Sequence, residues 1–351
     1  MATDIFIVQR FYYNFREGFF EYLSDRELNF RLVNSIVSRG KVKVHDDAAS
    51  RDFILKTPAI HIGNSYVLFP FLFFNLIRHK PRVIISEGGQ NTVNNLQVLM
   101  YSLLFNRRYI IWDLGKGYAD FGDSLKRKIY MGFYKLLLRK ASLVYGYHSQ
   151  SREYFKSLGV REEKIIVLNN TVDTRKIKEI RLRYPGNLPE EFEQDRNGEY
   201  TYLVFVGALA DNKNIESLAG LMRVLGEKYF LIIVGDGKPA YRQKLEKEFS
   251  DVNHIFVGYK KADQLAPYYG LASFSVLPGL GGLSINQSMA FGVPVICRGA
   301  DGAENDLVKN NVTGYIYEDI DDAAKYIRSK TARDWKNMGE KAEKLLYSEH
   351  S

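Results

Sequence analysis

The sequence is short of cysteine and of long apolar runs, and each shortage excludes a class of protein. Its single cysteine, Cys297, cannot form a disulfide within the chain, so we expect a reducing compartment. The longest apolar stretch covers residues 66–77, well below the roughly 20 residues that cross a bilayer, and it favours a buried helix. Residues 1–4 lead directly into a short apolar strand, which predicts that no signal peptide opens the chain.

Signatures of nucleic-acid binding are also missing. The chain has no helix-turn-helix pattern, zinc-finger spacing or RNP-like aromatic motif. Lys and Arg together number 49 against 41 Asp and Glu, which gives a formal net charge of +8. This balance suits an anionic membrane surface or phosphorylated small molecules, and it leaves nucleic acid as the least favoured partner.

Short apolar runs alternate with helical patterns along the whole chain. They lie at 5–8, 83–85, 109–111, 143–145 and 165–168, and again at 202–206, 230–234, 254–257, 274–277 and 294–297. The alternation predicts an α/β fold of two Rossmann-like domains, each a doubly wound parallel sheet, facing a cleft. We expect domains at 1–180 and 201–351, joined by a charged linker over 181–200 that contains Pro185 and Pro189.

Glycine-containing turns follow several strands of the second half. Gly207 ends the strand at 202–206, and Lys213 follows a few residues later. A Gly-Asp-Gly turn at 235–237 ends the next strand. Glycine lets backbone amides approach a phosphate, and lysine can neutralise it. Taken alone, the first turn favours an ordinary strand-turn-helix with a solvated lysine, and the Gly-Asp-Gly turn is common in α/β proteins.

In their order and spacing these motifs resemble the retaining glycosyltransferases of family 4, which have the GT-B fold. The block at 288–295, Ser-Met-Ala-Phe-Gly-Val-Pro-Val, is similar to the family's Glu-Ala-Met-Ala-x-Gly-x-Pro-Val. The runs at 169–173 and 310–315 resemble the family's Asn-Gly-Val-Asp and its turn after the last strand. The run at 13–20 resembles the opening of members that build envelope polysaccharides. The resemblance covers nearly the whole chain and is specific in its second half.

The resemblance implies a nucleotide-sugar site in the C-terminal domain. A UDP-, GDP- or dTDP-linked sugar would be a co-substrate, and no cofactor is expected. Lys213 would neutralise the diphosphate and stabilise the leaving group, assisted by the amides and the dipole of a helix that opens near 281–284. The residues assigned to the donor are Gly207, Asn214, Gly235, Asp236, Gly237, Gly258, Tyr259, Gly281, Gly282, Leu283, Ser284, Ile285 and Gln287.

The sequence departs from the family at its two glutamates, which fall on Gly279 and Gln287. In the family the first usually contacts the donor sugar and the second the ribose. Glutamine keeps the reach of the second without its charge. Glycine at the first implies space at the sugar, and hence a 6-deoxyhexose or N-acetylated donor, or compensation by Asn286 or Glu304. A donor panel on Gly279→Glu would then show a changed preference.

Polar residues also follow two strands of the first half. Glu87 comes after the strand at 83–85, where a ligand contact and a helix cap are equally compatible. Asp113 follows the strand at 109–111, where the family often has a histidine. We assign Glu87, Asp113 and Lys213 to catalysis. The residues assigned to the acceptor side are Arg16, Gly88, Gly89 and His148, although a lone histidine is more often a solvated or satisfied residue.

Two charged segments each lead to a separate prediction. Residues 124–140 carry six cations and no acid, with apolar residues at helical spacing. They predict a basic amphipathic helix on an anionic bilayer, with a core-facing helix as the alternative. The Asp-x-Asp at 319–321 resembles the metal motif of the other glycosyltransferase fold, but its place before a helix favours N-capping, so we expect no metal.

The resemblance therefore implies a retaining hexosyl- or deoxyhexosyltransferase that acts on a glycan or lipid-linked glycan, and we expect it to be metal-independent. We expect it in bacterial surface-polysaccharide or lipopolysaccharide synthesis, in the cytoplasm and peripheral at the inner face of the cytoplasmic membrane. Two alternatives remain open. One is a non-catalytic partner subunit with the same fold, and the other is a sugar-nucleotide epimerase, for which carboxylates and histidines are sparse.

Overall fold

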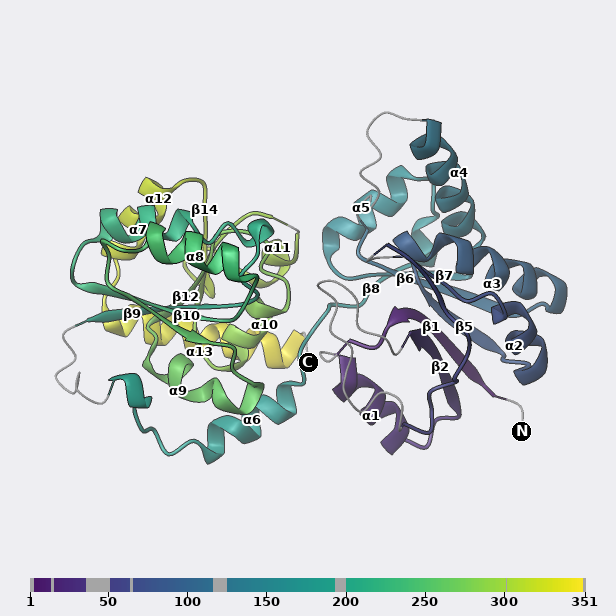
Figure 1. Ribbon diagram of the computed structural model, residues 1–351, viewed down its shortest axis with the longest axis horizontal. Helices are drawn as coiled ribbons and strands as arrows, with labels where there is room; N and C mark the ends of the chain where they lie inside the picture. The colour runs from purple at the N-terminus through teal and green to yellow at the C-terminus, as the bar shows by residue number, and fades with distance from the viewer. Residues whose placement is uncertain are drawn as a thin grey trace. The chain divides into compact units, whose positions relative to one another are not determined.

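The computed structural model describes residues 3–13, 16–35, 51–63, 66–115, 125–192, 200–300 and 302–349 (Figure 1). These residues belong to two compact units that divide between Asn169 and Asn170. Asn14, Phe15, Ser124 and residues 193–199, which the sequence predictions include, lie outside the described residues.

The N-terminal unit is built on a parallel sheet of six strands in the order β2-β1-β5-β6-β7-β8. The strands are β1 (Ile5–Phe11), β2 (Phe30–Ser35), β5 (Val83–Glu87), β6 (Arg108–Asp113), β7 (Leu143–Gly146) and β8 (Ile165–Val167), and β3 (Ile60–Ile62) pairs with β4 (Tyr66–Leu68) as a separate antiparallel hairpin. Helix α1 (Glu17–Asp25) lies on one side of the sheet (Figure 1). The helices on the other side are α2 (Leu72–His79), α3 (Thr92–Phe105), α4 (Leu125–Lys140) and α5 (Ser149–Ser157).

The C-terminal unit repeats this architecture with the order β11-β10-β9-β12-β13-β14, again all parallel. Its strands are β9 (Thr201–Val206), β10 (Tyr229–Val234), β11 (His254–Gly258), β12 (Phe274–Leu277), β13 (Val295–Arg298) and β14 (Gly314–Tyr317). Its helices are α6 (Thr174–Arg183), α7 (Ser217–Leu225), α8 (Pro239–Glu248), α9 (Ala266–Leu271), α10 (Leu283–Ala290), α11 (Ala303–Leu307), α12 (Ile320–Arg328) and α13 (Ala332–Glu349). Buried side chains from strands and helices form one core cluster in each unit.

The structure confirms the predicted α/β fold and adds four strands to those expected, namely β2 and β14 at the edges of the two sheets and the hairpin strands β3 and β4. Arg31 and Asn34 interrupt the apolar run of β2, so the period of that strand is hidden in the sequence. Strand β14 lies where the sequence predicted a turn after the last strand, because Gly314 pairs with Val295 at the edge of the sheet. Both sheets were recognisable because their central strands are continuous apolar runs, as strands buried on two faces require.

The boundary between the units lies earlier than the predicted linker at 181–200. Helix α6 belongs to the C-terminal unit, because Ile177 is buried in that core. Arg181 donates to the carbonyl oxygen of Ala290 at 3.1 Å and forms an ion pair with Glu343. Phe192, inside the predicted linker, packs edge-on against Tyr202 of β9. The many charges of this segment conceal the few apolar residues that fix it to the core.

Each sheet has one point at which the strand order reverses. In the N-terminal unit the chain leaves β1 for β2 on one side, and β5 pairs with β1 on the other. In the C-terminal unit β9 lies between β10 and β12 in the same way. At such a point the loops after the two strands diverge, which leaves room for a ligand at the carboxyl ends.

Candidate functional site

In the C-terminal unit, the loops after β9 and β12 are tied to one another. The short 3₁₀ helix η6 (Asp211–Lys213) follows β9, and the loop at 278–282 follows β12. The amide of Leu280 donates to the carbonyl oxygen of Asn212 at 3.2 Å, and the ammonium of Lys213 donates to the carbonyl oxygen of Leu280. Asn214 reaches the carbonyl oxygen of Pro278 at 3.5 Å. The predicted phosphate-binding lysine is therefore held at the switch point by the β12 loop.

The Gly-Asp-Gly turn after β10 packs its backbone against the β9 loop. A Cβ on Gly235, whose φ is +150°, would lie 1.8 Å from the carbonyl oxygen of Gly207, so only glycine fits. The amide of Leu209 donates to the carbonyl oxygen of Asp236 at 2.9 Å, and that of Gly235 to Gly258 of β11 at 2.8 Å. The ends of β9, β10 and β11 thus form a continuous edge of backbone groups.

Helix α10 begins beside this edge. Gly282, with a φ of +53°, precedes its first residue, and no side chain caps the helix. The hydroxyl of Ser284 would lie 3.8 Å from a Cβ built on Gly207. The amides and dipole of this helix therefore begin close to the β9 turn, where an anion is stabilised. Leu283, Ser284 and Gln287 are half-buried, and Tyr259 is exposed.

Gly279 does not leave the space that the sequence comparison implied. A Cβ there would lie 2.6 Å from the carbonyl carbon of Lys213 and 2.7 Å from the carbonyl oxygen of Asn212. The β12 loop is packed backbone to backbone on η6, so a side chain cannot enter without moving one of the two loops. The expectation of space at position 279 is therefore wrong for this arrangement of the loops, whereas a changed donor preference of Gly279→Glu stays a prediction.

The two residues expected to compensate for Gly279 are engaged with backbone groups. The buried Asn286 donates to the carbonyl oxygen of Asn170 at 3.1 Å. The buried carboxylate of Glu304 accepts from the amides of Ala300 and Gly302 at 2.6 and 3.0 Å. Gln287 differs, because its side chain has no hydrogen bond to the described residues.

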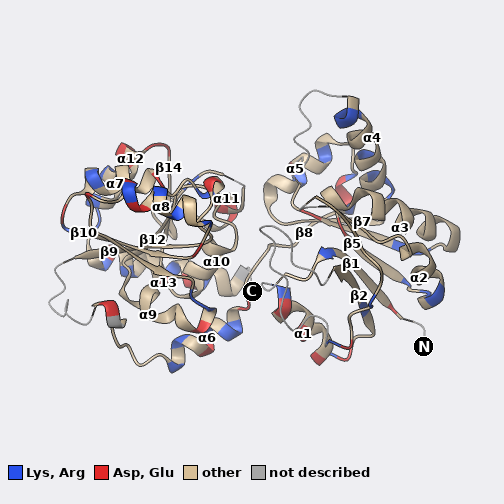
Figure 2. Ribbon diagram, in the orientation of Figure 1, with Lys and Arg blue, Asp and Glu red and all other residues tan. Residues whose placement is uncertain are grey.

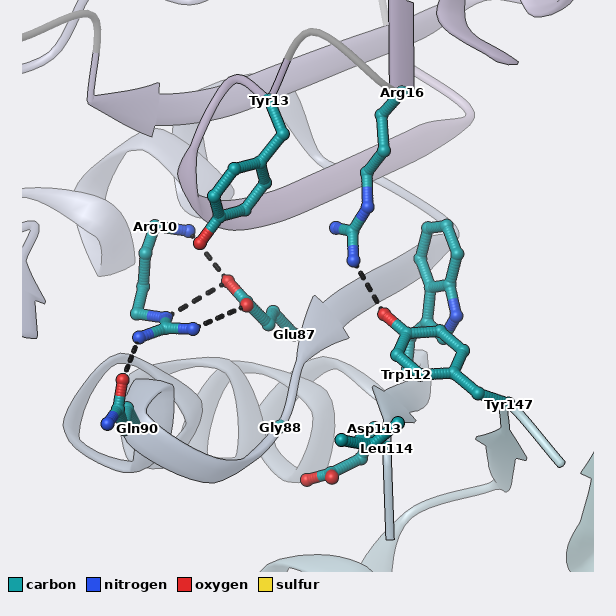
Figure 3. Close-up of a pocket in the computed structure, with 10 residues that line it drawn as sticks. All are labelled: Arg10, Tyr13, Arg16, Glu87, Gly88, Gln90, Trp112, Asp113, Leu114 and Tyr147. Carbon is teal, nitrogen blue, oxygen red and sulfur yellow. Dashed lines mark hydrogen bonds and ion pairs between the residues drawn. The ribbon is translucent and has the colours of Figure 1, made fainter. Parts of the chain in front are cut away.

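The N-terminal unit has a pocket of about 150 Å³ at its own switch point (Figure 3). The lining residues come from the ends of β1, β5, β6 and β7 and the loops that follow them. They are Arg10, Tyr13, Arg16, Glu87, Gly88, Gln90, Trp112, Asp113, Leu114 and Tyr147. The structure therefore brings together Arg16, Glu87, Gly88 and Asp113 of the predicted residues.

Glu87 is held by Arg10 in a two-pronged ion pair (Figure 3). The guanidinium Nη2 lies 2.7 Å from Oε1, and Nε and the backbone amide of Arg10 donate to Oε2 at 3.2 and 3.0 Å. Arg10 also donates to the side-chain oxygen of Gln90. Burial raises the pKa of Glu87, but Arg10 outweighs burial and the pKa lies below its ordinary value. Glu87 is thus an ionised group that orients Arg10, and it caps no helix.

Arg16 lies over the face of Trp112, with its guanidinium carbon 4.6 Å from the ring centroid. It donates to the hydroxyl of Tyr147 at 2.5 Å (Figure 3). Burial raises the pKa of both Tyr13 and Tyr147 to about 12, so both phenols are neutral at physiological pH. This part of the pocket presents a cation among aromatic rings and neutral hydroxyl groups, which suits a hydroxylated or anionic ligand group.

Asp113 lines the pocket and is also held in place by hydrogen bonds from two other residues. Its carboxylate accepts from the amide of Gly115 and from the hydroxyl of Tyr134, both at 2.9 Å. Burial raises its pKa to about 6, and the hydrogen bonds from Gly115 and Tyr134 oppose that shift only in part. Asp113 is therefore a carboxyl group that can exchange a proton close to neutral pH.

His148 lies outside the pocket lining and is the N-cap of α5. Its Nδ1 accepts from the amide of Ser151 at 3.2 Å, and its ring is buried. Gly89 begins the short 3₁₀ helix η3 (Gly89–Asn91) and is likewise buried and absent from the lining. The pocket gives neither residue a ligand-facing position.

Sequence reasoning missed Arg10, Gln90, Tyr13 and Tyr147. Arg10 and Tyr147 stand at or just after the ends of β1 and β7, so the rule that ligands bind at carboxyl ends could have found them. The Arg10–Glu87 pair joins residues far apart in the chain, which no local pattern reveals.

The Asp-x-Asp segment caps a helix, as predicted. Asp319 is the N-cap of α12, and its carboxylate accepts from the amide of Asp322 at 2.8 Å. Among the described residues, no group of three or more His, Cys, Asp or Glu side chains is arranged to hold a metal ion.

Comparison with known proteins finds similarity to glycosyltransferases. The model for "Glycosyl transferases group 1" matches residues 189–345. A GDP-mannose-dependent alpha-mannosyltransferase of Corynebacterium glutamicum is 34% identical over 36% of this chain and 30% of its own length. An O-antigen biosynthesis glycosyltransferase of Escherichia coli is 25% identical over 55% of this chain and 51% of its own. The chain thus spans between about a third and a half of these relatives.

A solved structure extends the likeness to both units. The Anabaena protein HepE, in complex with UDP and glucose, superposes with a TM-score of 0.74 at 14% identity, over 100% of this chain and 96% of that one. At this identity the likeness concerns the fold alone. The chain therefore has the GT-B fold, and residues 189–345 of its C-terminal unit match the model of the glycosyl transferases group 1.

Proposed function

We propose that this chain transfers a sugar from a nucleoside diphosphate donor to a glycan or lipid-linked glycan. The observation that carries the proposal is the switch point of the C-terminal unit. There the backbone edge of β9 and β10, the ammonium of Lys213 and the start of α10 converge on one place. A diphosphate is the ligand class that such a combination of amides, helix dipole and cation stabilises.

In the proposed reaction the bond from the sugar to the diphosphate breaks and the nucleoside diphosphate leaves. Lys213 and the backbone amides near Gly281–Ser284 stabilise the charge that develops on the leaving group, with no metal ion. Lys213 bonds a carbonyl oxygen of the β12 loop, so a phosphate oxygen would share or replace that carbonyl. Gln287, which has no side-chain partner among the described residues, is proposed to contact the ribose.

The pocket of the N-terminal unit is the proposed acceptor side. Arg16, with Trp112 and Tyr147 beside it, would bind a hydroxyl or an anionic group of the acceptor. Asp113 would hold or release a proton there, because burial raises its pKa to about 6. We propose retention of the anomeric configuration, which the family resemblance supports. A role in bacterial surface-polysaccharide synthesis is supported by the O-antigen biosynthesis relative.

A second candidate, a non-catalytic relative that binds the nucleotide without turnover, is favoured by one observation. Position 279 has neither a carboxylate nor room for one, and the buried Asn286 and Glu304 are engaged with backbone groups. In this case the donor sugar would lack the group that usually holds its hydroxyls.

Calorimetry with UDP, GDP and dTDP, followed by turnover of the matching sugar donors with and without EDTA, separates these possibilities. We expect one diphosphate to bind and its sugar donors to be consumed equally well in EDTA. If none of the three diphosphates binds, the proposed donor site is wrong. Binding without turnover of any donor would favour the non-catalytic relative, and turnover that requires added magnesium or manganese would exclude the metal-free reaction.

A further inference from the structure

Helices α2, α3 and α4 lie next to one another on one side of the N-terminal sheet and expose an unusual amount of apolar surface (Figure 1). Leu103 and Leu104 at the end of α3 are each 66% exposed, Phe74 of α2 is 65% exposed and Leu125 of α4 is 73% exposed. We call this surface the α2–α4 face. Its exposed large apolar side chains are Phe71, Phe74, Ile77, Val93, Met100, Leu103, Leu104, Phe105, Leu125, Ile129, Phe133 and Leu136.

In α4 these residues form a stripe opposite the core. Leu125, Ile129, Phe133 and Leu136 recur at intervals of four, four and three residues, which places them on one side of a helix. The residues that α4 buries, Tyr134, Leu137 and Leu138, lie on its other side. The helix is therefore apolar on both faces, and among the described residues only the face with Tyr134, Leu137 and Leu138 is buried in the core.

The charge of the α2–α4 face has a single sign. None of the three helices contains an aspartate or a glutamate. Helix α4 carries six cations, and Figure 2 shows them along its length, while Arg78 lies in the last turn of α2. Long basic side chains beside protruding apolar ones suit a surface that is apolar inside and anionic outside.

We propose that the α2–α4 face docks on an anionic phospholipid bilayer. The apolar side chains of the three helices enter the acyl boundary, and the cations of α4 contact lipid phosphates. No described helix is long and apolar enough to span a membrane, so the contact is made by side chains on one leaflet. Four of the six cations of α4 are lysines, which are depleted in protein–protein interfaces, and this favours a bilayer over a protein partner.

The sequence pointed to α4 alone, and the structure adds the apolar row of α2 and α3. The stretch at 66–77, expected as a buried helix, is a strand followed by α2, and only part of it is buried. Leu72 and Leu76 face the core, whereas Phe74 and Ile77 are exposed. Because the two helices add mainly apolar area, with Arg78 as the arginine of α2, most of their contribution to docking resists salt, unlike that of α4.

Cosedimentation of the whole chain with vesicles tests this proposal without any donor or acceptor, so it stands or falls independently of sugar transfer. Vesicles of phosphatidylglycerol and phosphatidylcholine are compared with phosphatidylcholine alone. We expect sedimentation with the anionic vesicles only. Leu103→Ser/Leu104→Ser should lower the partition coefficient by roughly 100-fold or more, as two inserted leucines imply. Lys126→Glu/Lys128→Glu should lower it by roughly 30-fold or more, and only at low salt.

Matched controls lie on the C-terminal unit, where Leu182→Ser and Lys341→Glu/Lys344→Glu change residues of similar exposure and should leave sedimentation unchanged. Circular dichroism checks that each variant folds, which is expected because every altered side chain is exposed. Equal sedimentation of the parent and the Leu103/Leu104 variant would overturn the proposal. The proposal would also be overturned if the parent did not bind vesicles and light scattering showed a dimer that the Leu103/Leu104 variant abolishes. The face would then be a protein interface.

Discussion

The two units share one sheet topology but build the carboxyl edges of their sheets from different groups. In the N-terminal unit the edge consists of side chains, namely Arg10, Arg16 and Glu87 with the aromatic rings around them. In the C-terminal unit it consists of backbone groups exposed by Gly207 and Gly235, with Lys213 as the cation. A side-chain edge is specific for the shape and charge of one ligand, whereas a backbone edge suits any ligand with a phosphate.

This difference predicts that the two edges fail in different ways. Changes in the N-terminal edge disturb buried charges, so they are expected to act mainly on the stability of that unit. Changes in the C-terminal edge alter the position of amides and one cation, so they are expected to act mainly on nucleotide binding.

The largest expected effect is on the N-terminal edge, where Arg10→Ala leaves Glu87, whose side chain is only 12% exposed, without its main counter-charge. Removing one partner of a buried pair costs about 3–5 kcal/mol of stability. Urea unfolding followed by Trp112 fluorescence in a Trp335→Phe background reports on this unit. Arg82→Ala, whose exposed pair with Asp4 spans 3.9 Å, is the control and should cost under about 1 kcal/mol. The pairing would be contradicted if Arg10→Ala lowered the free energy of unfolding only slightly and if this small loss were the same in a Glu87→Gln background.

The second prediction concerns Asp113, because burial raises its pKa in the folded protein to about 6 from an ordinary value of 3.8. The folded state then binds the proton more tightly, so its contribution to stability is complete below pH 4 and is lost as the pH rises through 6. The difference corresponds to about 3 kcal/mol. Asp113→Asn should remove this component, so the stability of the variant relative to the parent should increase between pH 4 and 7. A constant difference across that range would show that Asp113 titrates normally.

The third prediction moves to the C-terminal edge. Lys213→Ala should weaken nucleoside diphosphate binding by about 1.5–3 kcal/mol, roughly 10- to 150-fold, with no change in unfolding. Lys247→Ala, an exposed lysine in the last turn of α8, is the matched control. Calorimetry that gives the same Kd for parent and Lys213→Ala would remove Lys213 from the diphosphate site.

Gly279→Ala tests the packing of the β12 loop on η6. The added Cβ would meet the backbone at Lys213, and overpacking of this kind costs about 1–3 kcal/mol. We expect a lower Tm and weaker diphosphate binding together, and a stronger loss for Gly279→Glu. A gain of donor turnover in Gly279→Glu would instead mean that the loop opens and that position 279 faces the sugar.

The smallest expected effect is at Gln287. Loss of one neutral hydrogen bond to a ribose hydroxyl is worth about 0.5–1.5 kcal/mol, so Gln287→Ala should raise the Kd roughly two- to tenfold. Gln287→Glu should change it less, because the carboxylate still accepts a hydrogen bond. Binding of a nucleoside diphosphate that lacks a ribose hydroxyl sharpens the test. Its Kd should differ less between the parent and Gln287→Ala than the Kd of the ordinary nucleotide does.

Sequence reasoning found those parts of the fold that repeat a short local pattern. Two kinds of feature were predictable because each depends on neighbours in the chain. They are continuous apolar strands such as β9 and β10, and the helix cap at Asp319. Strand β2 was not predicted because two polar residues, Arg31 and Asn34, interrupt its apolar run.

The parts of the site that the sequence did not predict depend on contacts between distant segments. The Arg10–Glu87 pair and the contact of Gly279 with the Lys213 backbone each join two loops at a switch point. A family comparison supplied the position of Gly279 but not the direction it faces, since the direction is set by how closely two loops approach. The boundary at Asn169 was missed for a similar reason, because a few apolar residues such as Ile177 and Phe192 fix a highly charged segment to the C-terminal core.

The first and last helices of the C-terminal unit hold one another. The hydroxyl of Tyr347 in α13 donates to the carbonyl oxygen of Thr174 at 3.1 Å, and Arg181 pairs with Glu343. Residues that begin and end this unit are therefore spatial neighbours. A circularly permuted version, with these two helices joined by a short linker and new ends opened in an exposed surface loop, should keep its core and its nucleotide edge.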